Sequence, residues 1–212
     1  MGPPLLARVE AQIGRLLYSS RARDAKLLPR SVPAIYSLSP TITVTSPCGA
    51  TSSPLLLEHT PIGSNKFPGL SWLLPADLPA EQIAGYLLIV EDPDAPLPDP
   101  VVHGLYYDIP AGKSTLAPED FVVAKETGEG GALAGGFRYG ANRMHSVWGG
   151  PKPVLGHGEH SYFFQLVALK ANLDLKSKGT KPLAKKDLLH GALDDGKVAA
   201  WGEWVGVFER QP

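Results

Sequence analysis

Two apolar strands joined by a constrained turn are predicted by residues 86–110, which read YLLIVEDPDAPLPDPVVHGLYYDIP. Residues 86–90 form an unbroken apolar run, which is typical of a strand buried on both faces. Residues 101–109 form the second strand, with a histidine, His103, near its start. The turn between them begins with two carboxylates, Asp92 and Asp94. A short turn of this kind can bring an aspartate at the end of one strand close to a histidine at the start of the next.

Composition excludes several classes of protein. The chain has 212 residues and a formal net charge of −1, so it has room for one sizeable core and no basic field that would attract nucleic acid. No apolar run is long enough to span a membrane, and charged residues interrupt the N-terminal apolar residues where a signal peptide would need a core. The sole cysteine, Cys48, cannot form an intrachain disulfide. We therefore expect a cytoplasmic protein without a transmembrane segment and without a nucleic-acid partner.

Short strands and many turns are indicated for most of the chain, which contains 23 glycines and 21 prolines. Helical spacing of apolar residues at positions 4–17 predicts a surface helix, docked on the core or on a partner. Residues 18–40 show no periodicity and are expected to be irregular. Further strands are predicted at 41–45, 54–58, 70–73, 121–124, 161–169 and 204–209, helices at 180–193 and 196–202, and a long loop at 135–153.

This order of elements lacks β-α-β alternation and favours a mostly β fold with peripheral helices. We expect a central antiparallel or mixed sheet assembly, an N-terminal helix and short C-terminal helices. Residues 1–40 would form a helix and an irregular extension, and residues 41–212 the main domain.

The pentapeptide Asp92-Pro93-Asp94-Ala95-Pro96 holds two carboxylates on a stiff loop, because each proline fixes its own φ and keeps the preceding residue extended. Considered alone, Asp92 and Asp94 are more simply interpreted as residues that cap a turn. A histidine such as His103 in an apolar strand is likewise more often a core residue than a functional one. Their proximity along the chain shifts that balance towards a site.

A second histidine-bearing segment, Gly156-His157-Gly158-Glu159-His160, enters the strand at 161–169. Its flanking glycines indicate a loop, and the metalloprotease motif is absent. A zinc site from Asp92, His103 and His160 is chemically conceivable but ranks below a pocket for an anion or polar ligand, so we expect no metal. The preceding turn at Gly149, Gly150 and Pro151 would allow backbone N–H groups to approach a bound anion.

Other candidates carry no chemistry that the sequence alone can assign. Cys48 lies in a predicted turn with nothing to mark it as an activated nucleophile, and His59, His145 and His190 have no assignable partner. No P-loop, dinucleotide fingerprint or nucleophile elbow occurs, so no cofactor is expected.

Together these motifs resemble the phosphatidylethanolamine-binding protein family. The resemblance rests on the Asp-Pro-Asp-Ala-Pro turn, the His103 strand, and Gly150-Pro151 followed by His160-Ser161-Tyr162, with Leu70-Ser71-Trp72 as the lead-in. It extends over residues 41–210. The N-terminal helix and the sequence HGLYYDIP are most similar to fungal members of the family.

The resemblance implies the family's central β-sheet and one small cavity that binds phosphate-like or carboxylate anions, including phospholipid head groups. Carried over by motif, the ligand-binding residues would be Asp92, Asp94, His103, Gly150, Pro151, Pro153, His160 and Tyr162. The family's arginine before the motif tyrosine is here Ser161, and Val101 and Gly104 replace frequent aromatic residues. These departures predict a wider and less cationic pocket.

Two functions follow from the resemblance. The first is a binding protein for a small anionic ligand or phospholipid head group, which could regulate a protein partner such as a protease, a kinase or a pathway enzyme. The second is an accessory enzyme of fungal secondary metabolism, in which Asp92, His103 and His160 would be catalytic residues for acid–base chemistry on a carboxylate or anhydride. A metal-dependent hydrolase is a weaker third.

Overall fold

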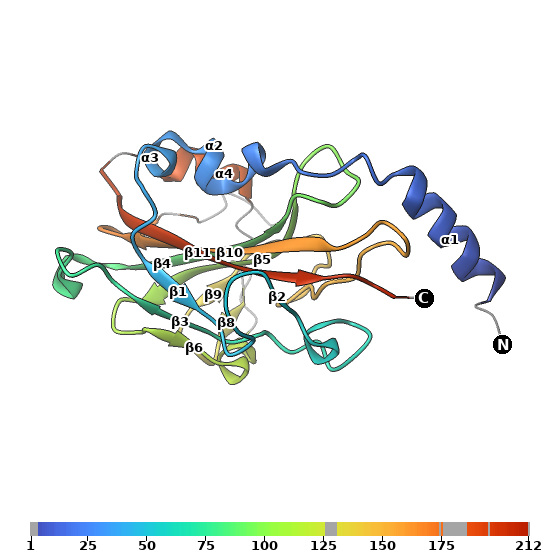
Figure 1. Cartoon of the computed structure of the whole chain (residues 1–212). Coiled ribbons are helices and arrows are strands. Elements are labelled where there is room, and N and C mark those ends of the chain that lie inside the picture. Colours follow the sequence, from blue (N-terminus) through green and yellow to red (C-terminus); the bar gives the residue numbers. More distant parts are fainter. Residues whose placement is uncertain (1–3, 126–130, 174, 176–185, 195, 212) are drawn as a thin grey trace.

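An eight-stranded mixed sheet forms the centre of the protein (Figure 1). The computed structural model describes residues 4–125, 131–173, 175, 186–194 and 196–211. Among the described residues, the strands of this sheet pair antiparallel, except β2 with β11, which pair parallel. Its strands, in spatial order, are β2 (Ser53–Pro54), β11 (Val198–Phe208), β10 (His160–Leu169), β4 (Gly85–Asp92), β5 (Val101–Pro110), β9 (Arg138–Tyr139), β8 (Ala132–Leu133) and β7 (Val123–Lys125).

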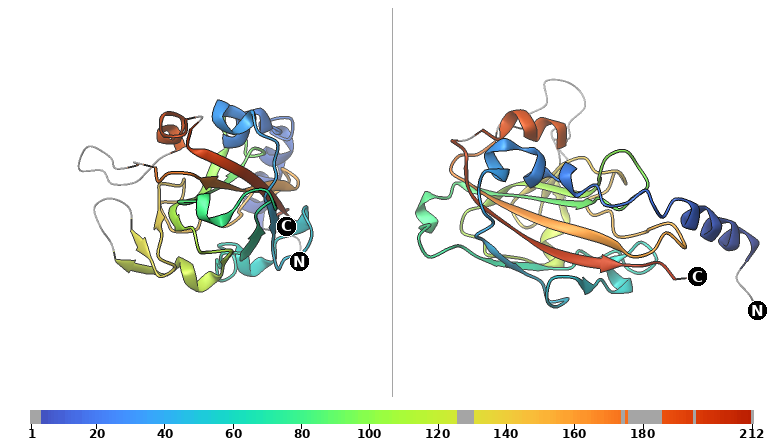
Figure 2. Two further views of the ribbon diagram at one scale, coloured as in Figure 1. Left: turned by 90° about the vertical axis from the view of Figure 1, so that its left-hand side faces the viewer. Right: turned by 45° about the horizontal axis from the view of Figure 1, so that its top comes forward.

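A smaller sheet covers one face of the large one (Figures 1 and 2). It contains β1 (Thr43–Thr45), β3 (Leu70–Leu73) and β6 (Thr115–Leu116). The space between the two sheets is filled by an aromatic core that includes Phe67, Tyr106, Trp148, Phe164 and Trp204. Phe67 packs edge-on against three of these rings, with centroid distances of 5.3 to 5.8 Å.

Short helices cover the opposite face: α2 (Leu28–Ser31), α3 (Pro33–Tyr36) and α4 (Lys186–Ala192). Along β4, Leu87 and Ile89 belong to the core beneath these helices, whereas Leu88 and Val90 belong to the core between the sheets. This confirms that the apolar run at 86–90 is buried on both faces, and it confirms the predicted mostly β fold with a mixed central sheet and an N-terminal helix.

Residues 18–40 differ from the irregular extension that was predicted. They contain η1 (Asp24–Lys26), α2 and α3, and the two α-helices each have a proline within their first two positions, where its missing N–H costs little. Leu28, Val32 and Ile35 are buried against the large sheet. Helices of a single turn are too short to produce a detectable period of apolar residues, so the sequence does not reveal them.

The predicted short helix at 196–202 is wrong, because β11 already begins at Val198. β11 pairs with β10 from Val198 to Phe208, and this pairing outweighs the local propensity of the segment. Gly202 is required there, since a Cβ would lie 2.0 Å from the carbonyl oxygen of Ile42. The other boundaries shift modestly.

The strand predicted at 54–58 is reduced to the two residues of β2, followed by the 3₁₀ turn η2 (Leu57–His59). Two further 3₁₀ turns are η3 (Ala80–Gln82) and η4 (Pro118–Phe121). The predicted loop at 135–153 contains the short strand β9, and α4 covers the end of the helix predicted at 180–193, of which 180–185 lie outside the described residues.

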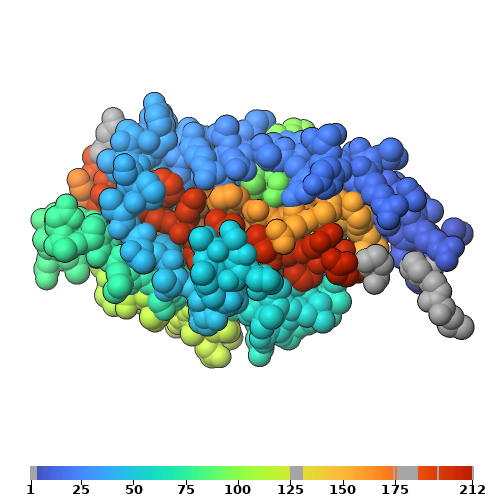
Figure 3. All heavy atoms as spheres, viewed as in Figure 1, coloured from blue at the N-terminus to red at the C-terminus, as the bar shows by residue number. Residues whose placement is uncertain are grey.

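The N-terminal helix α1 (Leu5–Leu16) is present as predicted, and it contacts the body of the protein through the face that carries Gly14, not through its apolar face. This face of α1 packs closely against the rest of the protein. A Cβ on Gly14 would lie 2.0 Å from the carbonyl oxygen of Leu155. The apolar face of α1 is exposed to solvent: Leu6 and Leu16 are 83% and 82% exposed. Figure 3 shows α1 at one end of the molecule, beside the loop that precedes β10.

Candidate functional site

Asp92 is the best-connected polar residue of the candidate site. It ends β4, and its side chain is 3% exposed. Its Oδ1 accepts hydrogen bonds from the backbone N–H groups of Asp94 (2.8 Å) and Ala95 (3.1 Å), as a turn-capping aspartate does. Its Oδ2 accepts a hydrogen bond of 2.8 Å from Nδ1 of His160. The aspartate therefore caps its turn and orients a histidine at the same time.

Several opposing effects act on the charge of Asp92. Burial raises its pKa, but the nearby His103 and the hydrogen bond from His160 lower it more, so its pKa lies well below that of an ordinary aspartate. Asp92 is consequently a carboxylate at neutral pH. Because both of its oxygens already accept hydrogen bonds, its part in the site is to cap the turn and to hold the imidazole of His160.

His103, near the start of β5, presents one ring nitrogen to the site. Its Nδ1 donates a hydrogen bond to the carbonyl oxygen of Gly149, which determines the tautomer of the neutral ring. Its Nε2 lies 3.8 Å from Oδ2 of Asp92, which is too long for a hydrogen bond. The Nε2 atom is thus held near a carboxylate while it retains its capacity to bind a ligand.

His160, the first residue of β10, is bonded through both ring nitrogens. Besides Asp92, it contacts His157, whose Nδ1 lies 2.7 Å from Nε2 of His160. His157 is fully buried, and its Nε2 donates to the carbonyl oxygen of Leu17 at 2.9 Å. Positive φ angles at Gly156 (+75°) and Gly158 (+87°) fold the loop so that the two rings meet.

The proton count of this histidine pair follows from its partners. Asp92 and the Leu17 carbonyl can only accept, so the two outer bonds require one N–H each, and the bond between the rings requires a third. Two neutral imidazoles carry only two protons, and the pair therefore holds one positive charge when all three bonds are made. Burial lowers the pKa of His157, and the Asp92 carboxylate, which accepts from His160, stabilises the charge that the pair shares.

Asp94 points towards the N-terminal segment. Its Oδ2 accepts from the backbone N–H of Ser161 (2.9 Å), its Oδ1 accepts from the N–H of Ala22 (3.2 Å), and Nε of Arg21 lies 3.5 Å away. Arg21 also donates to the carbonyl oxygen of Glu159. A cation from the N-terminal segment thus stands close to Ser161, at the position where the expected arginine is missing from β10.

A cavity of about 250 Å³ opens beside these groups. It is lined by Asp92, Ala95, Pro96, Leu97, Val101, His103, Arg143, Met144, Gly150, Lys152, Pro153, Val154, His160 and Tyr162. Six of the eight residues predicted to bind a ligand are among them, whereas Asp94 and Pro151 are not. Arg143 and Lys152, which the sequence did not single out, add two exposed cations.

Tyr162 lines this cavity and carries a buried hydroxyl. Its side chain is fully buried, and its hydroxyl has no hydrogen-bond partner among the described residues. Burial, followed by the negative charges of Asp92 and Asp94, raises the pKa of Tyr162 well above its ordinary value, so the hydroxyl keeps its proton. The ring of His103 packs edge-on against it at a centroid distance of 5.0 Å.

The loop that carries Arg143 is held by Asn142. The buried Asn142 amide donates to the carbonyl oxygens of His103 (3.0 Å) and Ser146 (2.7 Å), and its oxygen accepts from the backbone N–H groups of Met144 and Ser146. The amide's two donors and its acceptor oxygen are thus all used. Arg143 and Met144 are therefore held at the edge of the cavity.

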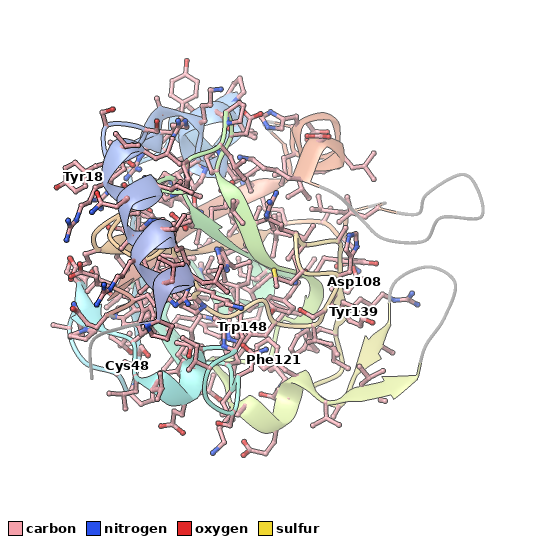
Figure 4. The ribbon with its side chains drawn as sticks, turned by 90° about the vertical axis from the view of Figure 1, so that its right-hand side faces the viewer. Tyr18, Cys48, Asp108, Phe121, Tyr139 and Trp148 are labelled. Carbon is pink, nitrogen blue, oxygen red and sulfur yellow. The ribbon has the colours of Figure 1, made fainter. Side chains whose placement is uncertain are left out.

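Two further observations concern the described residues. None of their histidine, cysteine, aspartate and glutamate side chains form a group of three or more suited to hold a metal ion. None of their helices has the length and apolar character needed to cross a membrane. Figure 4 views the end of the molecule where α1 lies, with Tyr18 at its margin.

Comparisons with known proteins agree with the site motifs. The sequence profile described as phosphatidylethanolamine-binding protein matches residues 41–209. The phomoidride biosynthesis cluster protein B of a fungal species is 40% identical over 97% of this chain and 96% of its own length. A protein of the same description from Talaromyces stipitatus is 37% identical over 98% of this chain and 83% of its own length.

Solved structures show the same fold. A phosphatidylethanolamine-binding protein homologue from Chlamydia trachomatis matches with a TM-score of 0.62 and 25% identity, over 81% of this chain and 99% of the other. Escherichia coli YbcL, described as a member of the mammalian family, matches with a TM-score of 0.62 and 25% identity, over 80% of this chain and 99% of its own. The chain therefore belongs to the phosphatidylethanolamine-binding protein family.

Proposed function

We propose that the protein binds a small anion of the phosphate or carboxylate type, free or as a phospholipid head group, in the cavity beside Asp92, His103 and His160. The observation that carries this proposal is Tyr162, which lines the same cavity as His103 and whose buried hydroxyl lacks a partner among the described residues. A buried donor left without a partner costs about 1–3 kcal/mol, and a ligand oxygen would remove that cost.

Charge supports an anionic ligand. The Asp92 carboxylate is balanced by the positive charge that its hydrogen bonds assign to the His157–His160 pair. Nε2 of His103 is too far from Asp92, at 3.8 Å, to hydrogen-bond to it, and is therefore available to the acidic group of a ligand. Arg143 and Lys152 add positive charge at the edge. His160, with both nitrogens bonded, would act by holding Asp92 and shaping the cavity wall.

Isothermal titration calorimetry tests the proposal with inorganic phosphate, phosphoethanolamine and acetate as separate titrants. We expect at least one of them to bind the wild-type protein, and we expect Tyr162→Phe and His103→Ala each to weaken that binding by about tenfold. His190→Ala, an exposed position on α4, is the matched control and should bind as the wild type does. The proposal fails if no anion binds, or if the first two variants bind like the control.

An accessory enzyme is the second candidate, and the hydrogen-bond chain from Asp92 through His160 to His157 favours it, because such chains move protons. The biosynthesis-cluster relatives are consistent with it. It predicts turnover of a carboxylic anhydride with a bell-shaped pH–rate profile that is lost in both His103→Ala and His160→Ala. If the protein binds its ligand without turnover, both variants should lower the affinity for that ligand and there is no turnover for them to abolish. A protein partner regulated by ligand binding is compatible with either function.

A further inference from the structure

The segment that follows α1, residues 17–23, lies against both loops that carry the anion site, and we call it the N-terminal brace. On the turn after β4, the backbone N–H of Arg23 donates to the carbonyl oxygen of Pro93 at 3.2 Å. On the loop before β10, the carbonyl oxygen of Leu17 accepts a hydrogen bond of 2.9 Å from Nε2 of His157. The brace therefore joins the aspartate turn to the histidine loop.

Two glycines allow the backbone of α1 to approach the loop that carries His157. A Cβ on Gly14 would lie 2.0 Å from the carbonyl oxygen of Leu155 and 2.8 Å from the backbone nitrogen of His157. From the loop side, a Cβ on Gly156 would lie 2.6 Å from the carbonyl oxygen of Ala11. Neither position has room for a side chain, so the docking of α1 fixes the start of the brace against the ring of His157.

The Leu17 carbonyl decides how many protons the histidine pair needs. With all three hydrogen bonds made, His157 and His160 together hold three N–H protons and one positive charge. Without the carbonyl, only the bond to Asp92 and the bond between the rings remain, and two neutral imidazoles supply both of those protons. In keeping with this count, burial lowers the pKa of His157 whereas its hydrogen bond to Leu17 raises it.

The brace also brings a fixed cation to the site. Nε of Arg21 lies 3.5 Å from Oδ1 of Asp94. The positive charges of His160 and Arg21 lower the pKa of His157, and the Asp92 carboxylate raises it. When α1 is docked, the surroundings of the two aspartates therefore hold both the guanidinium and the extra proton of the histidine pair, and both charges favour an anion in the neighbouring cavity.

We propose that the N-terminal brace is a positioning element of the anion site, because the docking of α1 lets the histidine pair take up one proton from water and so raises the affinity of the cavity for an anion. The inference rests on the proposed function for the anion itself. It goes further by giving a role to a segment that precedes residues 41–209, the part matched by the family profile. Leu17 and Arg21 act through His157 and Asp94, since neither lines the cavity.

Nitrogen NMR of the imidazole rings at pH 7 counts the protons directly. We expect three of the four ring nitrogens of His157 and His160 to be protonated in the wild type. Two should be protonated in Gly14→Leu, whose side chain cannot fit against Leu155. Gln12→Ala, at an exposed position of α1, is the matched control and should keep three. Two protons in the wild type, or three in Gly14→Leu, would overturn the proposal.

Calorimetry with inorganic phosphate at pH 7 measures the consequence for binding. One unit charge in partly buried surroundings is worth about tenfold in affinity, so Gly14→Leu should bind phosphate about tenfold more weakly than the wild type and Gln12→Ala. Among the described residues, no residue of α1 belongs to either apolar core, so Gly14→Leu should keep the midpoint of urea unfolding of the wild type.

The outcomes separate this proposal from the proposed function. If Gly14→Leu binds phosphate as tightly as the wild type while Tyr162→Phe weakens binding, the anion site stands and the role of the brace is overturned. If the wild type binds no anion but the proton counts are three and two, the proposed function fails, and the control of the histidine pair by the brace holds without it.

Discussion

Nδ1 of His160 lies 2.8 Å from Oδ2 of Asp92, although 68 positions separate the two residues in the chain. β4 and β10 are neighbours in the sheet, and Asp92 ends the first where His160 begins the second. Antiparallel pairing of these strands is what brings the carboxylate to the ring. Five predictions rest on contacts of this kind.

Asp92→Asn should destabilise the protein at pH 7 by about 3 kcal/mol, because it leaves the charge of the His157–His160 pair without its carboxylate. Urea unfolding measures the effect. Asp99→Asn is the matched control on the same turn, since Asp99 is exposed and pairs with Lys26 at 2.9 Å. Equal stabilities of the two variants would show that the buried contact contributes nothing.

The same aspartate predicts a pH dependence. The folded pKa of Asp92 lies below that of the unfolded chain, so its contribution to stability is complete above the unfolded pKa, near 3.8. As the pH falls through and below that value, the unfolded state takes up the proton first, and the free energy of unfolding decreases. The difference between wild type and Asp92→Asn should therefore narrow from pH 7 to pH 3; a constant difference would contradict this assignment.

His157→Ala should cost about 1–3 kcal/mol of stability, because it leaves Nε2 of His160 and the carbonyl oxygen of Leu17 without their partner. His190→Ala, at an exposed position, should change the free energy of unfolding by less than about 0.5 kcal/mol. Guanidinium unfolding at pH 7 measures both. A His157→Ala protein as stable as His190→Ala would mean that the histidine pair carries no net stabilisation.

Arg21→Gln should loosen the N-terminal segment, because Arg21 joins Asp94 and the carbonyl oxygen of Glu159 to that segment. Chymotrypsin cleavage after Tyr18 reports local opening, and we expect it to accelerate roughly twofold to tenfold at unchanged global stability. Arg15→Gln on α1 is the control, and its cleavage rate should match that of the wild type.

Cys48 should react with iodoacetamide at a lower pH than an ordinary thiol. Burial raises the pKa of Cys48, but its contact with His59, at 3.4 Å from Sγ to Nε2, outweighs burial and leaves the pKa lowered. His59→Ala should move the midpoint of the rate–pH profile upwards, whereas His190→Ala should not. The only cysteine of the chain makes the readout unambiguous. Identical profiles for the wild type and His59→Ala would refute the pairing.

By itself, the sequence determined the strands at 86–90, 101–109 and 161–169 and the motifs at their ends. Runs of apolar residues select buried strands locally, and the prolines at 93 and 96 restrict the turn between them. These features depend on residues close to one another in the chain. The grouping of Asp92, His103 and His160 was implied by the family resemblance instead, because 68 positions separate Asp92 from His160.

Only the tertiary structure decided which groups complete the site and which faces are covered. His157 joins His160 through a loop bent at two glycines, and Arg21 reaches Asp94 from 73 positions away. The apolar stripe of α1 faces outwards because small residues, Gly14 above all, allow the closer approach to the loop at 155–157. Periodicity states which side of a helix is apolar, but the shape of the opposing surface decides which side docks.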